Sequence, residues 1–176
     1  MMKRYLTAAL VVGVLAAASV AGGVATAVAD GAADQQPSTV EDFSYPGADQ
    51  IFADTGVRLI SGDGHVLFAD CATPRTGDIG LVQVHSSQAI GAKHDGVICF
   101  KVTETSGTVQ VQIPAVFEIR GDGYAPGAGH KVKAKLTTDA GAQSTVDVNP
   151  SGSTPVGQGT GPGAAPTTLL QLTANP

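Results

Sequence analysis

Histidines are the residues of this chain best suited to acid–base or metal chemistry. There are four of them: His65, His85, His94 and His130. Carboxylates that could complete an acid–base pair or a metal site accompany two of them, Asp63 and Asp70 near His65 and Asp95 beside His94. No two histidines have metalloprotease spacing, and each lies at a predicted strand end or in a predicted loop. We therefore interpret them as exposed turn residues, with no metal ligand among them.

Other catalytic signatures are missing from the sequence. Ser86 and Ser87 follow a histidine, but no Gly-x-Ser-x-Gly motif occurs. The glutamates are not paired as glycoside hydrolysis requires. The glycines of 152–163 precede no predicted helix, so a phosphate-binding loop is not expected there. The sequence therefore predicts a protein that is not an enzyme, with no catalytic residue and no cofactor.

Cys71 and Cys99 are the only cysteines. In an oxidising compartment such a pair is most simply a disulfide, closing a loop worth about 3 kcal/mol by the loop-entropy estimate. Around Cys99, the apolar Ile98 and Phe100 fall on one face of a predicted strand, and Cys99 falls on the other with Lys101. We therefore expect the disulfide at a sheet margin or on an outer face.

Two features are candidate binding elements. Lys131, Lys133 and Lys135 project from one face of a predicted strand. They could bind an anionic glycan or cell-wall polymer, although the same pattern protects exposed edge strands from pairing, which is the interpretation we favour. The second feature is Arg75, in the loop 71–78, where an exposed arginine would suit the pocket of a trypsin-like protease.

The sequence Gly-Asp-Gly occurs twice, at 62–64 and 121–123, each time after an apolar strand. Calcium binding through Asp63 and Asp122 is one hypothesis. Asp-Gly is also the commonest tight-turn pair, and no further carboxylate is in register, so we favour turns. At 62–65 we expect a tight hairpin. Residues 120–122 also spell the cell-adhesion tripeptide Arg-Gly-Asp, which is weak evidence on its own.

The first 29 residues predict a cleavable secretory signal. Lys3 and Arg4 form a basic start, residues 6–24 are almost wholly apolar and small, and Ala27-Val28-Ala29 precedes Asp30. A retained membrane anchor is the alternative. Cleavage leaves 147 of the 176 residues, and loss of the two basic residues changes the formal charge from −5 to −7. An acidic chain argues against a nucleic-acid partner.

The remaining sequence predicts short strands separated by turns. Residues 30–42 form a polar leader that we expect to be disordered, and 48–55 could hold a short helix that Gly56 ends. Residues 43–148 form the β-rich domain, and 149–166, rich in Gly, Pro and Ser, a linker or mobile loop. Within 167–176 lies a possible last strand. The predicted strands are 57–60, 65–69, 79–85, 97–103, 108–120, 131–137 and 143–148.

The segment 108–120 has the clearest alternation. Val109, Val111, Ile113, Ala115, Phe117 and Ile119 fall on one face, and Val116 is the one apolar exception on the other. Pro114 cannot donate a ladder hydrogen bond, so we expect an edge position or a bend there. The pattern as a whole predicts an all-β fold, either an antiparallel β-sandwich of immunoglobulin-like architecture or a small β-barrel.

The Ala-, Gly-, Thr- and Val-rich composition and the form of the signal resemble small exported proteins of high-GC Gram-positive bacteria. This resemblance implies export and carries no site residue. We expect a secreted, monomeric β-domain without a membrane span after cleavage, binding an extracellular protein or glycan. The alternatives are a protease inhibitor that presents the 71–78 loop and a hydrolase that uses His65, His85 or His94 with a carboxylate.

Overall fold

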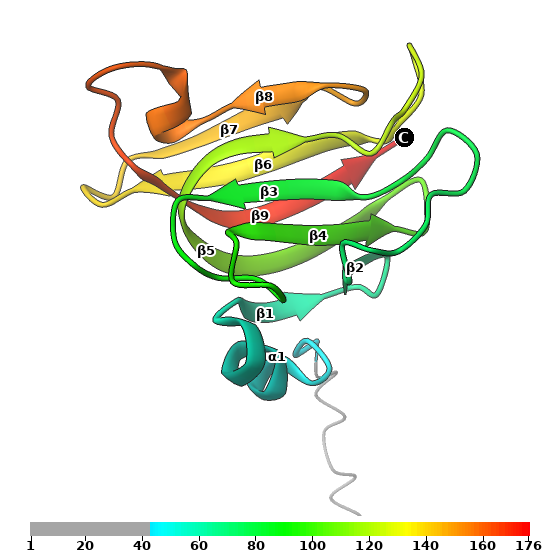
Figure 1. Ribbon diagram of the computed structural model, residues 1–176, viewed down its shortest axis with the longest axis horizontal. Coiled ribbons are helices and arrows are strands. Elements are labelled where there is room, and N and C mark those ends of the chain that lie inside the picture. Colours follow the sequence, from blue (N-terminus) through cyan, green and yellow to red (C-terminus); the bar gives the residue numbers. More distant parts are fainter. Residues whose placement is uncertain (1–42) are drawn as a thin grey trace, which may run out of the picture. The chain divides into compact units, whose positions relative to one another are not determined.

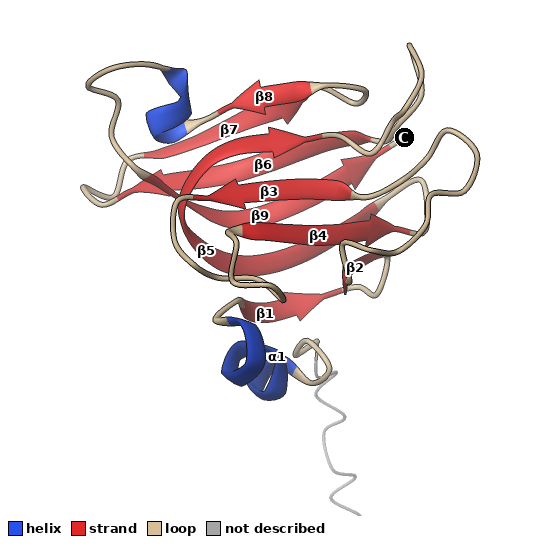
Figure 2. Ribbon diagram, in the orientation of Figure 1, coloured by secondary structure: helices blue, strands red, loops and turns tan. Residues whose placement is uncertain are grey.

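The computed structural model describes residues 43–176, so the expected signal (1–29) and leader (30–42) lie outside the described residues. The described chain is all-β, with antiparallel strands and little helix (Figures 1 and 2). None of its helices is long and apolar enough to cross a membrane. Its elements are α1 (Ala48–Thr55), β1 (Arg58–Gly62), β2 (Val66–Ala69), β3 (Val82–Ser86), β4 (Val97–Val102), β5 (Gly107–Arg120), β6 (Lys131–Thr138), β7 (Gln143–Val148), β8 (Ser153–Pro155), the 3-10 helix η1 (Gly157–Thr160) and β9 (Thr167–Asn175).

β5 is the central strand of the sheet and pairs with β1, β3, β8 and β9. The strand order is β2-β4-β3-β5-β9-β6-β7, and β1 and β8 also pair with β5. β1 pairs with residues 109–112 of β5, whereas β3 pairs with residues 116–120. The two halves of one strand therefore hold different neighbours, and the hydrophobic core is buried against both halves.

The bend expected at Pro114 is present, and Figure 1 shows β5 as a long curved strand. Ala115 has φ 52°, and the register with β9 shifts between Ile113 and Val116. The Ser86 hydroxyl donates to the Pro114 carbonyl at 2.7 Å, which satisfies a carbonyl at the bend. Such a bulge bends the strand and lets it exchange one set of partners for another.

Because of the bend, the residues of β5 that are buried differ from those that the sequence predicts. Val109, Val111, Ile113 and Ile119 are buried as expected. Val116, the predicted exception, is buried as well, whereas Ala115 and Phe117 are only half-buried. The irregular backbone at 115–117 changes the phase of the alternation, so strict period two fails beyond Ile113.

The predicted tight hairpin at 62–65 is wrong. β1 pairs with β5 and β2 pairs with β4, so the two strands on either side of Asp63-Gly64 are not partners. The turn instead carries the chain from one part of the sheet to another. Its local chemistry is that of a turn, because Gly64 has φ 83° and the Asp63 carboxylate accepts from the His65 N–H at 3.0 Å.

The C-terminal part of the chain belongs to the sheet. β9 pairs with β5 and β6, and β8 pairs with β5. Residues 149–166, expected to be a linker or mobile loop, thus hold a strand and η1. Val156 is 2% exposed and its N–H donates to the Phe117 carbonyl at 2.9 Å. A Cβ on Gly159 would meet that carbonyl oxygen, so this glycine is required for close approach.

The short helix and the disulfide follow the sequence predictions. α1 ends at Gly56, which has φ 72° and donates its N–H to the Phe52 carbonyl. A disulfide joins Cys71 to Cys99, with the Cα atoms 5.3 Å apart. Cys99 is buried but does not belong to the core cluster, which contains Ile98. The disulfide therefore lies on the outer face of β4, where it attaches the segment after β2.

Candidate functional site

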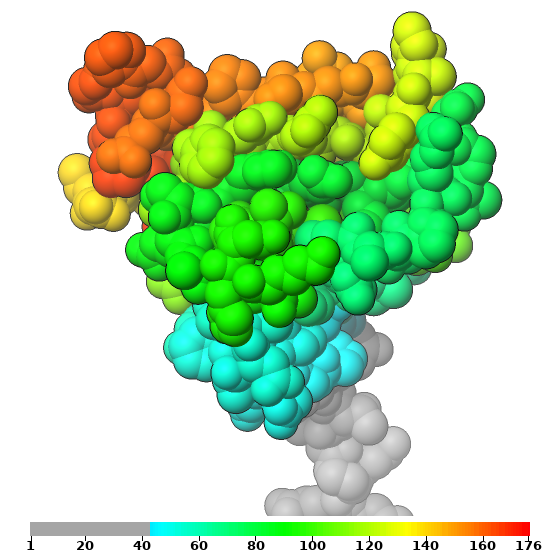
Figure 3. All heavy atoms as spheres, viewed as in Figure 1, coloured from blue at the N-terminus to red at the C-terminus, as the bar shows by residue number. Residues whose placement is uncertain are grey.

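Three loops meet at one end of β3 and β5. The N–H of Gly80 donates to the Asp122 carbonyl at 2.7 Å, which joins the 71–80 loop to the 121–130 loop. The N–H groups of Gly121 and Gly123 donate to the carbonyls of Gly152 and Pro150, which adds the 149–152 turn. In Figure 3 the yellow-green 121–130 loop stands beside the green 71–80 loop. Backbone hydrogen bonds thus fix the three segments to one another.

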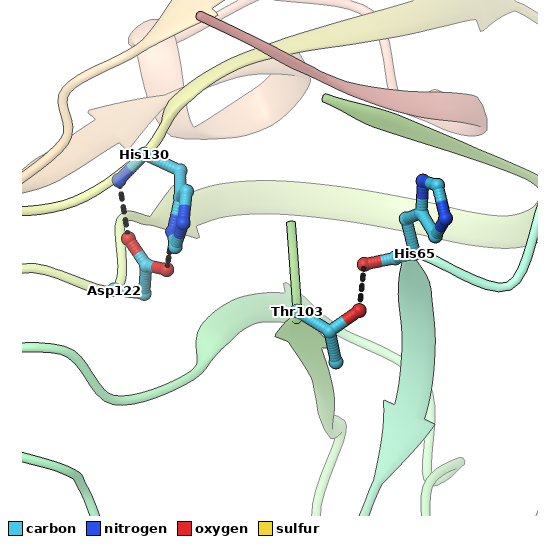
Figure 4. A network of polar contacts seen from close by, with 4 residues as sticks. All are labelled: His65, Thr103, Asp122 and His130. Atoms are coloured by element: carbon cyan, nitrogen blue, oxygen red, sulfur yellow. Dashed lines mark hydrogen bonds and ion pairs between the residues drawn. The ribbon is translucent and has the colours of Figure 1, made fainter. Parts of the chain in front are cut away.

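The 121–130 loop is closed by one aspartate. Oδ1 of Asp122 accepts from the backbone N–H of His130 at 2.8 Å, and Oδ2 lies 2.6 Å from Nδ1 of the same histidine (Figure 4). The Asp122 side chain is 0% exposed and that of His130 is 22% exposed. A buried carboxylate needs such partners, because an unpaired buried charge is strongly unfavourable.

The glycines on either side of Asp122 allow the loops to approach closely. A Cβ on Gly121 would lie 2.2 Å from the Pro150 carbonyl oxygen, and one on Gly123 would lie 2.3 Å from that of Ala128. Neither backbone atom can move without moving its loop. The Gly-Asp-Gly sequence at 121–123 is thus explained by packing, with a buried clamp between two close backbone contacts.

A pocket of about 490 Å³ lies between these loops and the strands beneath them. Gln83 of β3 and Arg120 of β5 are direct register partners, so their side chains emerge side by side on one face. The lining residues are Gln83, Arg120, Gly121, Gly123, Tyr124, Ala125, Pro126, Ser151 and Gly152. Loops on a rigid sheet are the usual place for binding residues.

The polar groups in this pocket are largely unused by the protein. Within residues 43–176, the Gln83 amide and the hydroxyls of Tyr124 and Ser151 have no hydrogen-bond partner. Arg120 is 55% exposed, and its Nε lies 3.9 Å from Oε1 of Glu118, which also accepts a short hydrogen bond from the Ser153 hydroxyl. The terminal nitrogens of Arg120 remain without a protein partner in the described chain.

Tyr124 connects the pocket to Arg75. The Arg75 guanidinium lies over the Tyr124 ring, 5.0 Å from its centroid, in a cation–π contact. The ring also lies close to Gly80, where an added Cβ would come within 2.4 Å of it. Arg75, predicted as a binding residue of the 71–78 loop, is therefore brought to the rim of the pocket.

The lysine stripe has a different setting. Lys131, Lys133 and Lys135 are exposed on β6 as predicted, but β6 lies between β7 and β9, so the edge-protection interpretation is wrong. Lys133 pairs with Asp147 at 2.6 Å, and Lys131 donates to the Pro176 carbonyl at 2.9 Å. A smaller cavity of about 290 Å³ includes the first two of these lysines. Two of the three lysines thus already have a partner in the described chain, and for Lys133 this partner is a carboxylate.

In the described chain the side chains of His65, His85 and His94 form no hydrogen bond or ion pair with a carboxylate, although the backbone N–H of His65 donates to Asp63. Nδ1 of His65 lies 3.0 Å from the Ser106 carbonyl oxygen, and the backbone carbonyl of His65 accepts from the Thr103 hydroxyl (Figure 4). The His85 ring lies edge-on to Phe117, and its Nε2 is buried without a hydrogen-bond partner in residues 43–176. In the same range no three His, Cys, Asp or Glu residues form a group that could hold a metal ion.

Among the described residues, 43–176, Asp63 alone has a clearly shifted pKa. Burial alone would raise it, but the N–H groups of His65 and Thr108 donate to the carboxylate, at 3.0 and 2.8 Å, and the nearby His65 charge adds to their effect. The net result is a pKa below the ordinary value of 3.8. Asp63, like Asp122, is thus occupied in holding its own turn.

The sequence does not predict the Asp122–His130 contact or the pocket. Its pattern favours exposed turns for the histidines, His130 included, and is compatible with Asp122 as a turn residue, a calcium ligand or part of Arg-Gly-Asp. Because Asp122 is completely buried, its carboxylate cannot present that tripeptide to a receptor. The two glycines beside Asp122 were a signal of crowding, but nothing in the sequence indicated the partner eight residues later.

No protein-family model matches this chain, and no curated protein is significantly similar to it.

Proposed function

We propose that this chain is a secreted, non-enzymatic β-domain whose task is to bind a ligand in the pocket beneath the three loops. One observation carries the proposal: Gln83, Arg120 and Tyr124 line a single cavity of about 490 Å³. The Gln83 amide, the terminal guanidinium nitrogens of Arg120 and the Tyr124 hydroxyl have no hydrogen-bond partner on the described protein. A concave site of this size with a few convergent polar groups is typical of a small-ligand site.

Two observations support the extracellular setting. The first 29 residues have the pattern of a cleavable signal. The Cys71–Cys99 disulfide suits an oxidising compartment. We also propose that the sheet closes as a sandwich, in which the bent β5 serves both layers, with its first half beside β1 and its second beside β3.

The protease-inhibitor alternative has weaker support. An inhibitory arginine must extend freely into a protease pocket, whereas the Arg75 guanidinium lies over the Tyr124 ring. Entry into a protease would require Arg75 to leave that contact. The hydrolase alternative needs the ring of His65, His85 or His94 beside a carboxylate, and no side-chain hydrogen bond or ion pair of that kind is present within residues 43–176. The His130 ring does meet a carboxylate, that of Asp122, but both oxygens of Asp122 are already engaged in closing its loop.

Affinity capture with a matched pair of variants tests the proposal. The mature protein is immobilised and exposed to the soluble and wall-derived molecules of its producing organism, and retained small molecules and glycans are identified by mass spectrometry. Arg120→Ala removes the pocket cation. Arg58→Ala is the control, because Arg58 is also exposed on the sheet but contacts Phe52 of α1.

We expect a ligand retained by the wild type and by Arg58→Ala and lost with Arg120→Ala. Equal retention of the ligand by all three proteins would show that the pocket is not the binding site. Chemical conversion of a retained molecule would instead show an enzyme.

A further inference from the structure

The pocket presents a single guanidinium among neutral hydrogen-bonding groups. Arg120 supplies the one positive charge among the lining residues, while Gln83, Tyr124 and Ser151 supply an amide and two hydroxyls. No acidic side chain lines the cavity. This combination fits a ligand that has one anionic group and several hydroxyl groups.

Arg120 lies beside Glu118 on β5. Its Nε faces Oε1 of Glu118 at 3.9 Å, and that same oxygen is held by the Ser153 hydroxyl. The two terminal amino groups of Arg120 have no partner among the described residues. Two parallel N–H···O bonds to a planar carboxylate are the contact that a guanidinium makes best.

The neutral groups are placed to accept and donate to hydroxyls. Gln83 emerges beside Arg120 from the adjacent strand, so a ligand held by Arg120 also reaches the Gln83 amide. Tyr124 and Ser151 come from two different loops on the walls. Amides and hydroxyls that both donate and accept match sugar hydroxyls, which do the same. Ala125 and Pro126 add a small apolar wall that suits the C–H groups of a sugar ring.

We propose that this pocket binds an acidic saccharide of the uronic-acid type, with the ring carboxylate on Arg120 and the ring hydroxyls on Gln83, Tyr124 and Ser151. This inference rests on the proposed function and names its ligand class. Arg75, which contacts the lining residue Tyr124, places a second cation next to the pocket. Glu118 near Arg120 repels any anion, and it repels a dianion such as a phosphate more strongly than a single carboxylate, because the Coulomb energy grows with the charge.

Titration calorimetry at low ionic strength tests this with four defined probes. D-Glucuronate carries both the carboxylate and the ring hydroxyls. D-Glucose lacks the carboxylate, glucose 6-phosphate replaces it by a dianion, and N-acetyl-Ala-Ala has a carboxylate without the ring. We expect glucuronate to bind at least about tenfold more tightly than each of the others, as expected for one charge-assisted pair of hydrogen bonds.

Variants assign the contact to the pocket. Arg120→Ala should weaken glucuronate binding at least about tenfold, Arg120→Lys less, since lysine keeps the charge without the fork, and Arg58→Ala not at all. Gln83→Ala should weaken glucuronate and glucose binding by similar factors. Circular dichroism of each variant checks folding, which the exposed Arg120 side chain is not expected to affect.

Each contrary result overturns a defined part of the inference. Equal affinity for glucose and glucuronate would show that the pocket does not recognise the carboxylate. Preference for glucose 6-phosphate would show that it recognises a phosphate instead, and preference for N-acetyl-Ala-Ala would show that it recognises a peptide end and not a sugar. If no probe binds but affinity capture still depends on Arg120, the proposed function stands and the saccharide assignment is wrong. If neither depends on Arg120, both are wrong.

Discussion

Asp122 holds His130 at two points, with one carboxylate oxygen on the backbone N–H and the other on the ring Nδ1, 2.8 and 2.6 Å away. The carboxylate has no exposed surface, so water cannot replace either contact. The pair closes the loop that carries Tyr124, Ala125 and Pro126 over the pocket. A buried clamp thus fixes the shape of a surface site.

Removal of the clamp should destabilise the whole domain. Asp122→Ala leaves the His130 N–H and ring without an acceptor in a closed loop, and we expect a loss of about 2–4 kcal/mol in the free energy of unfolding. Asp122→Asn keeps one acceptor oxygen and should cost less. Urea denaturation followed by circular dichroism measures both. Asp139→Ala, in the exposed β6–β7 turn, is the control and should change stability by less than about 0.5 kcal/mol. A wild-type midpoint for Asp122→Ala would show that the clamp is dispensable.

The backbone at Ala115 provides a second stability test. Its φ of 52° is a conformation that glycine adopts freely and β-branched residues avoid. Ala115→Gly should therefore be neutral or stabilise the fold by up to about 1 kcal/mol, although glycine normally weakens strands. Ala115→Val should destabilise by at least about 1 kcal/mol. Thermal unfolding of the two variants in parallel gives their order of stability. A valine variant more stable than the glycine variant would contradict the positive φ at Ala115.

The local part of the fold could be predicted from the sequence. The alternation of β6 gives Val132, Ala134 and Leu136 inside and the lysines outside, as observed. Gly56 ends α1 as expected. These features depend on a few neighbouring residues, whose periodicity and backbone freedom are written in the sequence itself.

Long-range pairing could not be predicted. β9 lies between β5 and β6 although about thirty residues separate β6 from β9, and local patterns do not specify such partners. The glycines of 149–166 suggested mobility, but Gly157 and Gly159 are there because a Cβ would collide with neighbouring atoms, including the Phe117 carbonyl oxygen. The pocket and the Asp122–His130 contact arise from such pairings, so neither was visible in the sequence.

The lowered pKa of Asp63 makes stability depend on pH in the acid range. A carboxyl whose pKa is lower in the folded state stabilises the fold above its unfolded pKa and loses that effect as the pH falls through the folded value. The advantage of the wild type over Asp63→Asn should therefore be present at pH 6 and shrink from about the ordinary value of 3.8 downward. Urea midpoints from pH 6 to 2.5 measure it, and a difference that stays constant with pH would contradict the assignment.

The disulfide should contribute through the loop that it closes. Cys71 and Cys99 are 28 residues apart, and opening that loop is expected to cost about 3 kcal/mol. Because the bridge lies on the outer face of β4, replacement of both cysteines by alanine should leave the core contacts of Ile98 and Phe100 intact. The double variant should still fold, with a lower urea midpoint and a native-like circular dichroism spectrum. A spectrum typical of a molten globule would contradict the outer-face position and indicate that the disulfide belongs to the core.

Gly80 connects the fold to the pocket. A Cβ at this position would come within 2.4 Å of the Tyr124 ring, which is the outer part of a side chain and can move. Gly80→Ala should therefore change stability by no more than about 1 kcal/mol while displacing the ring and breaking the Arg75 contact. The Tyr124 ring resonances should shift, and binding of any ligand held by the pocket should weaken. Gly62→Ala is the matched control, because its Cβ would meet the Thr108 carbonyl oxygen at 3.2 Å, in contact with β5 and with no part of the pocket. Unchanged Tyr124 resonances in Gly80→Ala would mean that the ring does not contact Gly80. Unchanged ligand affinity despite shifted ring resonances would mean that Tyr124 does not contribute to binding.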